Sequence, residues 1–357
     1  MCKYIWLALL AIGVIGGYAT LRFCQVATQE TTRREVSDKL QQVLTWLPAD
    51  TETISVARGP FALEAPPRQD WTPQTWDPNR VVPDSQLAQM FEDVPLLLFN
   101  FKNGSLFKRL QGKRVVLAIE GSRHFRAPTG LGMGPFEGCA VAVFADDLGD
   151  DTSALIRETR KAALRVEEIQ GLQVSVFQEK SEENVWTTFV AFPNKHVVLV
   201  ASDSDYLREV LTRLQSSKGK RALPNDLPEW NYVDTESRFW GLRHYDRNQA
   251  KTDPTSPIGG RLTGKEPDEK AVGITFVFDP SRGRSATITY LSGDKGLTGK
   301  AKELLEMGNA PEAKGLNIVI REIAPGVSQG TYSLERVEPT DTFFFLLSYL
   351  FGHAIYL

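Results

Sequence analysis

The stretch "EGSRHFRAPTGLGMGPFEGCAVAVFAD", residues 120–146, has a counterpart in "WGLRHYDRNQAK" (240–251) followed by "DEKAVGITFVFD" (268–279). Gly121-Ser122-Arg123-His124-Phe125 aligns with Gly241-Leu242-Arg243-His244-Tyr245 at an offset of 120 residues. Each copy ends a predicted strand, enters a loop with Gly or Pro, and reaches a predicted buried strand. This recurrence within the same order of elements predicts an internal repeat.

Runs rich in β-branched and aromatic residues extend outward from both copies and are typical of strands. The first set is "RVVLAIEG", "CAVAVFAD", "LQVSVFQ", "VWTTFVAF" and "HVVLVAS", and the second is "RFWGLRHY", "VGITFVFD", "ATITYLS", "LNIVIRE" and "TYSLERV". Helical patterns cover Ser153–Glu168, "DSDYLREVLTRL" and "LTGKAKELLEM". The sequence therefore predicts an α+β fold of two duplicated units with mainly antiparallel sheets.

Four segments are expected along the chain. They are an anchor or signal over 1–24, a helical and Pro-rich lead-in with one strand over 25–109, a first repeat unit over 110–222, and a second over 223–357. Within the lead-in, "EVSDKLQQVLTWLP" predicts a helix and "TISVARG" the strand. The uncharged C-terminal run Phe343–Leu357 predicts either a packing helix of the second unit or a surface for a membrane or partner.

The N-terminal segment "MCKYIWLALLAIGVIGGYATLRFC" carries Lys3 and then no charge from Tyr4 to Leu21. As a helix it is marginally long enough to span a bilayer. It also fits a signal peptide, because small residues at Gly17 and Ala19 would allow cleavage after Ala19. Both alternatives, a single-pass anchor and cleaved export, predict a body outside the cytoplasm.

Composition excludes some classes of function. The 357 residues include 42% hydrophobic and 24% charged residues, with a net charge of −3, and no basic block. These values predict a globular body and no nucleic-acid partner. Of three cysteines only Cys139 lies in the body, so neither an internal disulfide there nor a cysteine-rich zinc site is expected.

The common cofactor and catalytic motifs are incomplete. "GLGMGP" (130–135) precedes a strand instead of opening a helix, and "GDKGLTGKA" (293–301) has the wrong spacing for a phosphate loop. The four histidines are dispersed: His124, His196, His244 and His353. No cofactor or metal is predicted, and catalysis is less expected than binding.

The repeated Arg-His pairs are the candidate site. Because they recur at strand ends, a structural role in holding loops is one interpretation. The other is that Arg123, His124, Arg243, His244 and Asp246 bind a ligand, with the four basic residues presented to one anionic molecule. Catalysis by His244 with Asp246 or Asp253 is a third alternative.

The segments "LPADTETISVARGPF" (47–61) and "HVVLVASDSDYLREVLTRL" (196–214) follow an N-terminal anchor. In this order the chain resembles uncharacterised bacterial membrane-anchored extracytoplasmic proteins of a domain-of-unknown-function type. The resemblance implies a location in the bacterial envelope and brings no activity and no site residues.

The sequence thus favours a membrane-tethered, extracytoplasmic (periplasmic) binding or scaffold protein without catalytic activity. Its expected partners are the membrane, through the N-terminal helix, and an envelope protein or an anionic small molecule. The alternative is an envelope hydrolase that uses the Arg-His loops of the two repeats.

Topology can be tested with a reporter fused after Leu357 that is active only outside the cytoplasm. We expect activity from the full chain and loss of activity when residues 4–21 are deleted, because that run is the export signal. A fusion of the full chain that is active only as a cytoplasmic reporter would contradict the expected orientation.

Overall fold

The computed structural model describes nine segments of the chain, which hold every element discussed below. They are residues 37–62, 110–123, 137–145, 147–148, 150–180, 185–216, 220–244, 271–292 and 317–333. The sheet and the elements packed on it belong to one compact unit that begins at Val43.

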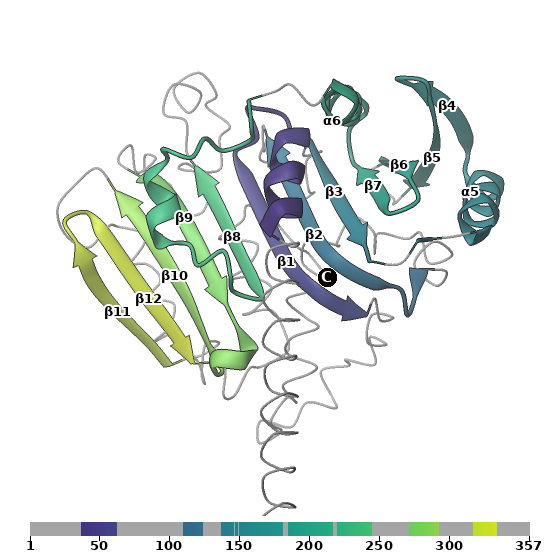
Figure 1. Cartoon of the computed structure of the whole chain (residues 1–357). Coiled ribbons are helices and arrows are strands. Elements are labelled where there is room, and N and C mark those ends of the chain that lie inside the picture. Colours follow the sequence, from purple (N-terminus) through teal and green to yellow (C-terminus); the bar gives the residue numbers. More distant parts are fainter. Residues whose placement is uncertain are drawn as a thin grey trace, which may run out of the picture. The chain divides into compact units, whose positions relative to one another are not determined.

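Within the described residues, twelve strands form one sheet in the order β11-β12-β10-β9-β8-β1-β2-β3-β7-β6-β5-β4 (Figure 1). All pairs of neighbours in this sheet are antiparallel. The strands are β1 (Thr53–Ala62), β2 (Arg114–Arg123), β3 (Glu137–Phe144), β4 (Arg165–Ile169), β5 (Leu172–Lys180), β6 (Val185–Asn194), β7 (Val197–Ala201), β8 (Phe239–His244), β9 (Ala271–Phe278), β10 (Ser285–Ser292), β11 (Asn317–Ala324) and β12 (Val327–Ser333). The expectation of a mainly antiparallel sheet is confirmed.

The strand β1 joins the two predicted repeat units. Its Ile54 lies opposite Gly121 of β2 on one side and Leu242 of β8 on the other. Its residues 53–58 are all nearly inaccessible to solvent, and since successive side chains point to opposite faces, both faces of the sheet are covered at β1. The lead-in strand therefore forms the centre of the sheet, with strands of both predicted units on either side.

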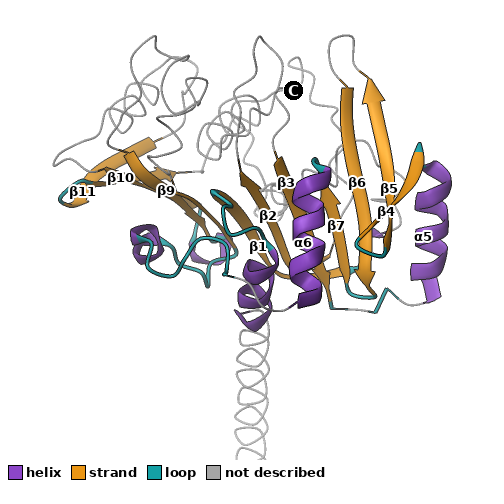
Figure 2. Ribbon diagram, turned by 90° about the horizontal axis from the view of Figure 1, so that it is seen from above, coloured by secondary structure: helices purple, strands orange, loops and turns teal. Residues whose placement is uncertain are grey.

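The two faces of the sheet are covered differently. The helix α6 (Ser204–Ser216) packs on β3, β6 and β7 (Figure 2). The short helix η3 (Pro228–Tyr232) packs on β8 and β9. Both lie on the face toward which Ile54 and Gly121 point, which we call the helix face. The side chains that alternate with these point to the second face, which we call the opposite face.

The helix α6 follows from local sequence signals. Asp203 caps it, since its Oδ1 accepts hydrogen bonds from the backbone N–H groups of Asp205 (2.9 Å) and Tyr206 (2.8 Å). Tyr206, Leu207, Val210 and Leu211 are the buried residues. The predicted helix and its apolar face are confirmed. The predicted helix before Pro48 is also observed over residues 37–46, and the expected strand is β1.

One predicted helix is shorter than expected. The prediction over Ser153–Glu168 was wrong at its C-terminal end, because α5 (Asp150–Ala162) stops before Arg165 and β4 begins there. Gln170 (φ 53°) and Gly171 (φ 72°) connect β4 to β5 in the left-handed conformation. Two consecutive left-handed residues favour a tight hairpin, so residues 165–169 pair with β5 instead of continuing the helix.

The order of strands differs between the predicted repeat units. β2 and β8 flank β1 in the same way, and β3 and β9 come next. Beyond β3 lies β7, the last strand of its unit, whereas beyond β9 lies β10, which follows through the short helix η4 (Pro280–Arg282). The order of the strands therefore does not confirm the internal repeat.

Several expectations fall outside the described residues. They are the anchor over 1–24, the Pro-rich part of the lead-in, the helix over 297–307 and the run Phe343–Leu357. In the part of the chain that the structure describes, no helix has the length and apolar character needed to cross a membrane.

Candidate functional site

A row of polar side chains crosses the helix face where β2 and β8 end. Glu52, just before β1, donates its backbone N–H to the Ser122 carbonyl (2.9 Å), and its own carbonyl accepts from the His244 N–H (2.8 Å). Continuing the register of β1 by one residue places Glu52 between Arg123 and His244. These three side chains therefore point to the same face from three adjacent strands.

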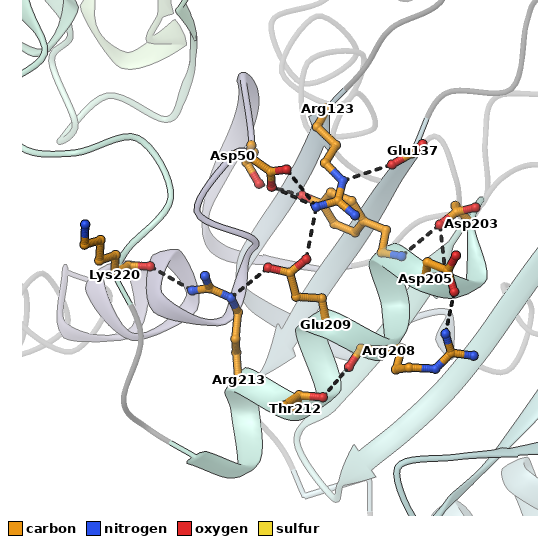
Figure 3. A network of polar contacts seen from close by, with 12 residues as sticks. Asp50, Arg123, Glu137, Asp203, Asp205, Arg208, Glu209, Thr212, Arg213 and Lys220 are labelled. Carbon is orange, nitrogen blue, oxygen red and sulfur yellow. Dashed lines mark hydrogen bonds and ion pairs between the residues drawn. The ribbon is translucent and has the colours of Figure 1, made fainter.

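Arg123 is held by carboxylates from three different elements (Figure 3). Its Nη1 donates to Asp50 Oδ1 (2.8 Å) and to Glu209 Oε2 (3.0 Å), and its Nε donates to Glu137 Oε2 (2.9 Å). Its guanidinium carbon also lies 5.2 Å from the ring centre of Tyr206. Arg123 thereby ties β2 to the turn before β1, to β3 and to α6.

The electrostatics favour the charged form of Arg123. Burial by itself would lower the pKa of Arg123, but the hydrogen bonds to the three carboxylates outweigh it and raise that pKa above its usual value. Because its side chain is only 12% exposed, little of its charge faces solvent. Three carboxylates around one guanidinium make the surroundings acidic, so an anionic ligand would meet repulsion here.

A second arginine extends this network to the segment before η3. Arg213 Nε pairs with Glu209 Oε1 at 3.2 Å, one helical turn away on α6 (Figure 3). Its Nη1 donates to the Lys220 carbonyl at 2.7 Å. Glu209 thus joins two arginines, and the C-terminal half of α6 is fixed to the chain that leads into η3.

His244 is paired with a buried carboxylate on η3. Its Nδ1 lies 2.8 Å from Glu229 Oε1, and Glu229 is completely buried while the His244 side chain is 30% exposed. Gly273 of β9 lies opposite His244, and a Cβ there would sit 2.0 Å from Glu229 Oε1. A glycine is therefore needed beneath Glu229, and the carboxylate fixes the orientation of the imidazole.

The opposite face carries a second polar group at the centre of the sheet. Five buried polar side chains lie there in two neighbouring rows: Thr53, Ser55, Glu120, Ser122 and Arg243. Burial raises the pKa of the Glu120 carboxyl from 4.5 to about 8. Glu120 is therefore protonated at neutral pH and can donate a hydrogen bond.

Arg123 and Arg243, which are aligned in the sequence repeat, do not occupy equivalent positions in the sheet. Arg243 lies opposite Thr53, as does Ser122, so the position equivalent to Arg243 in the first unit is Ser122. The paired strands are thus shifted by one residue relative to the sequence repeat. Because side chains alternate along a strand, Arg123 points to the helix face and Arg243 to the opposite face.

The described residues do not bring the expected basic residues together in one cluster. Arg123 and His244 share one face, Arg243 lies on the other, and His124 and Asp246 fall outside the described residues. The carboxylates that engage Arg123 and His244 had not been expected from the sequence. No local motif marks Asp50, Glu209 or Glu229, because each reaches its partner only through the fold.

No known protein family, no curated protein and no solved structure matches this chain. Among the residues that the structure describes, no group of three or more His, Cys, Asp or Glu side chains is arranged to hold a metal ion. The geometry of the polar row is therefore the basis for assigning a role.

Removing Arg123 tests its structural role. We expect Arg123→Ala to lower the free energy of unfolding by about 2–4 kcal/mol, because three neighbouring carboxylates would lose the guanidinium that they share, although Glu209 would keep its pair with Arg213. Arg208→Ala is the matched control, since Arg208 forms an exposed pair with Asp205, and should change stability by less than about 0.5 kcal/mol. Equal and small effects in urea unfolding would show that the network does not hold the fold.

Burial of Glu120 predicts a pH dependence of stability. Its folded pKa of about 8 exceeds the unfolded value of 4.5, so the folded state binds the proton more tightly. Its contribution is fully present below pH 4.5 and is lost as pH rises to about 8, by up to ~1.4 kcal/mol per pH unit. Glu120→Gln should therefore be more stable relative to the parent at about pH 8 than at about pH 5.

Urea unfolding at the two pH values measures this difference directly. The same substitution at the exposed Glu168 of β4 is the control, and should shift stability by less than about 0.5 kcal/mol at either pH. A difference between Glu120→Gln and the parent that does not grow with pH would contradict the assignment of a protonated Glu120.

Proposed function

We propose that this chain is a membrane-tethered, extracytoplasmic binding or scaffold protein without catalytic activity. The observation that carries the proposal is the engagement of Arg123 Nε and Nη1 by the carboxylates of Asp50, Glu137 and Glu209. Three carboxylates more than balance the charge of this guanidinium, so it attracts an anionic substrate poorly. In this proposal Arg123, one of the five candidate ligand-binding residues, has a structural role.

The location rests on the sequence. The uncharged run Tyr4–Leu21 and the resemblance to bacterial membrane-anchored extracytoplasmic proteins support a tether in the cell membrane with a periplasmic body. Cleavage near Ala19 would instead release a secreted form. The recurrence of Arg-His at residues 123–124 and 243–244 supports a duplicated α+β unit, and β2 and β8 both pair antiparallel with β1.

Charge favours a protein partner over an anionic small molecule at the polar row. Around Arg123 the exposed groups are carboxylates, with side chains 32–43% exposed. An anion would have to displace one of them from the guanidinium, whereas a protein surface with basic side chains would meet complementary charge. An envelope protein is therefore the partner that this region fits best.

The His244–Glu229 pair favours a second candidate, an envelope hydrolase. A buried carboxylate that orients an imidazole is a common arrangement for a general base. The carboxylate holds Nδ1, so proton transfer by this imidazole would have to use Nε2. The same pair also fastens η3 over β8 and β9, which is sufficient to explain it without catalysis.

One experiment separates the two candidates. The full chain is cross-linked in its native membrane and purified, and its partners are identified by mass spectrometry alongside the His244→Ala variant. For a scaffold we expect the same cross-linked envelope protein at equal yield in both, because His244 only supports the fold. Hydrolysis of an ester or amide probe that His244→Ala abolishes, with no such partner, would favour the hydrolase.

A further inference from the structure

The exposed apolar side chains of the described residues lie at the two edges of the sheet. Large hydrophobic residues are exposed at four described positions, Leu164 (62%), Val166 (43%), Val319 (50%) and Ile323 (44%). The first two belong to β4 and the residue before it, and the other two belong to β11. Edge strands present unpaired backbone groups, and apolar side chains beside them favour pairing with another strand.

The pairing of successive strands shows to which face of the sheet each side chain of β4 points. Val166 pairs with Ser175, and the same row continues through β6, β7 and β3 to Glu120. Val166 therefore points to the opposite face, whereas Arg165 and Glu167 point to the helix face. Arg165 and Glu167 form an exposed ion pair along the strand at 2.6 Å.

Antiparallel pairing of β4 with β4 of a second copy has few registers. A two-fold axis perpendicular to the sheet places one residue opposite itself and keeps both helix faces on the same side. Centring on Arg165, Glu167 or Glu168 sets that charge against its own copy, which is unfavourable. Centring on Val166 opposes Val166 to Val166 of the partner subunit and Arg165 to Glu167 of the partner subunit, twice by symmetry.

We propose that β4 is a homodimerisation edge, where two copies pair in the Val166-centred register and continue one sheet into the other. Two cross-strand ion pairs on the helix face and an apolar group on the opposite face support this register. That group consists of Leu164 and Val166 from both copies, which become diagonal neighbours. The pairing needs no ligand and is independent of the function of the polar row.

The edge strand β11 lacks this complementarity. A register centred on Arg321 or Glu322 sets like charges against each other. One centred on Ile320 opposes Arg321 to Val319 and forms no ion pair. One centred on Val319 opposes Arg321 to Asn317, with the same result. β11 therefore serves as the matched control for an edge that has similar apolar exposure but no favourable self-pairing.

A single pair of short edge strands makes a small contact, so pairing is expected to be weak in solution. Tethering to a membrane, which is part of the proposed function, would raise the effective concentration of the two edges. The test therefore uses the full chain in lipid vesicles, with Cys2 and Cys24 changed to Ser. Val166→Cys reports the contact, because the two thiols would face each other across the axis at a separation compatible with a disulfide.

We expect Val166→Cys to form a disulfide-linked dimer on mild oxidation, and Val319→Cys on β11 to form about tenfold less. Adding Arg165→Glu or Glu167→Arg should each lower the dimer yield about tenfold, since every cross-strand pair becomes like-charged. Mixing these two variants should restore it, because each substituted position then faces a residue of opposite charge. Restoration in the mixture depends only on contacts between copies.

A variant without the reporter thiol gives an independent readout, and melting temperatures identify any variant that fails to fold. Val166→Lys, with Arg165 and Glu167 kept, places two like charges at the axis. It should lower energy transfer between donor-labelled and acceptor-labelled copies in the vesicles, whereas Val319→Lys should leave that transfer unchanged. The proposal would be overturned if Val166→Cys and Val319→Cys gave equal yields of disulfide-linked dimer. It would also be overturned if mixing the Arg165→Glu and Glu167→Arg variants did not restore the dimer yield.

Discussion

The pairing of β1 along both of its edges is the constraint on which the remaining structure depends. A single row of side chains on the opposite face runs from Val166 on β4 through Ser55 on β1 to Ile320 on β11. Without β1 the two halves of this row have no strand pairing to each other. Because β1 is buried over residues 53–58 and antiparallel to both neighbours, its register fixes the positions of β2 and β8 together.

That register also decides the chemistry at the strand ends. Thr53 of β1 pairs with Ser122 of β2 and with Arg243 of β8, so the two strands are offset by one residue relative to the sequence repeat. Arg123 and Arg243 therefore point to different faces of the sheet. Arg123 then meets its three carboxylates beside α6, where Gly121 allows close packing: a Cβ there would lie 2.8 Å from Leu47 Cδ1. Arg243 lies instead in the buried polar group with Glu120. A shift of one residue in strand pairing thus gives these two arginines different surroundings.

Local patterns predicted the strands and α6 well, because alternation and helical periodicity are properties of short segments. Residues 165–168 of β4 were included in the predicted helix over Ser153–Glu168, whereas the Gln170–Gly171 hairpin pairs them with β5. The carboxylates of Asp50, Glu209 and Glu229 were missed because their partners are distant in sequence. The hypothesis that Arg123 and Arg243 bind one ligand required both side chains to point to the same face of the sheet. That depends on how β2 and β8 pair with β1, which the sequence near each arginine does not reveal.

Hydrogen exchange of the β1 amides tests most directly whether this strand unites the sheet. If it does, the amides of Val56 and Ala57 should exchange only through global unfolding, with the same free energy as core amides of both β2 and β8. This role of β1 would be contradicted if the amides of one half of the sheet lost protection at a lower denaturant concentration while β1 stayed protected with the other half.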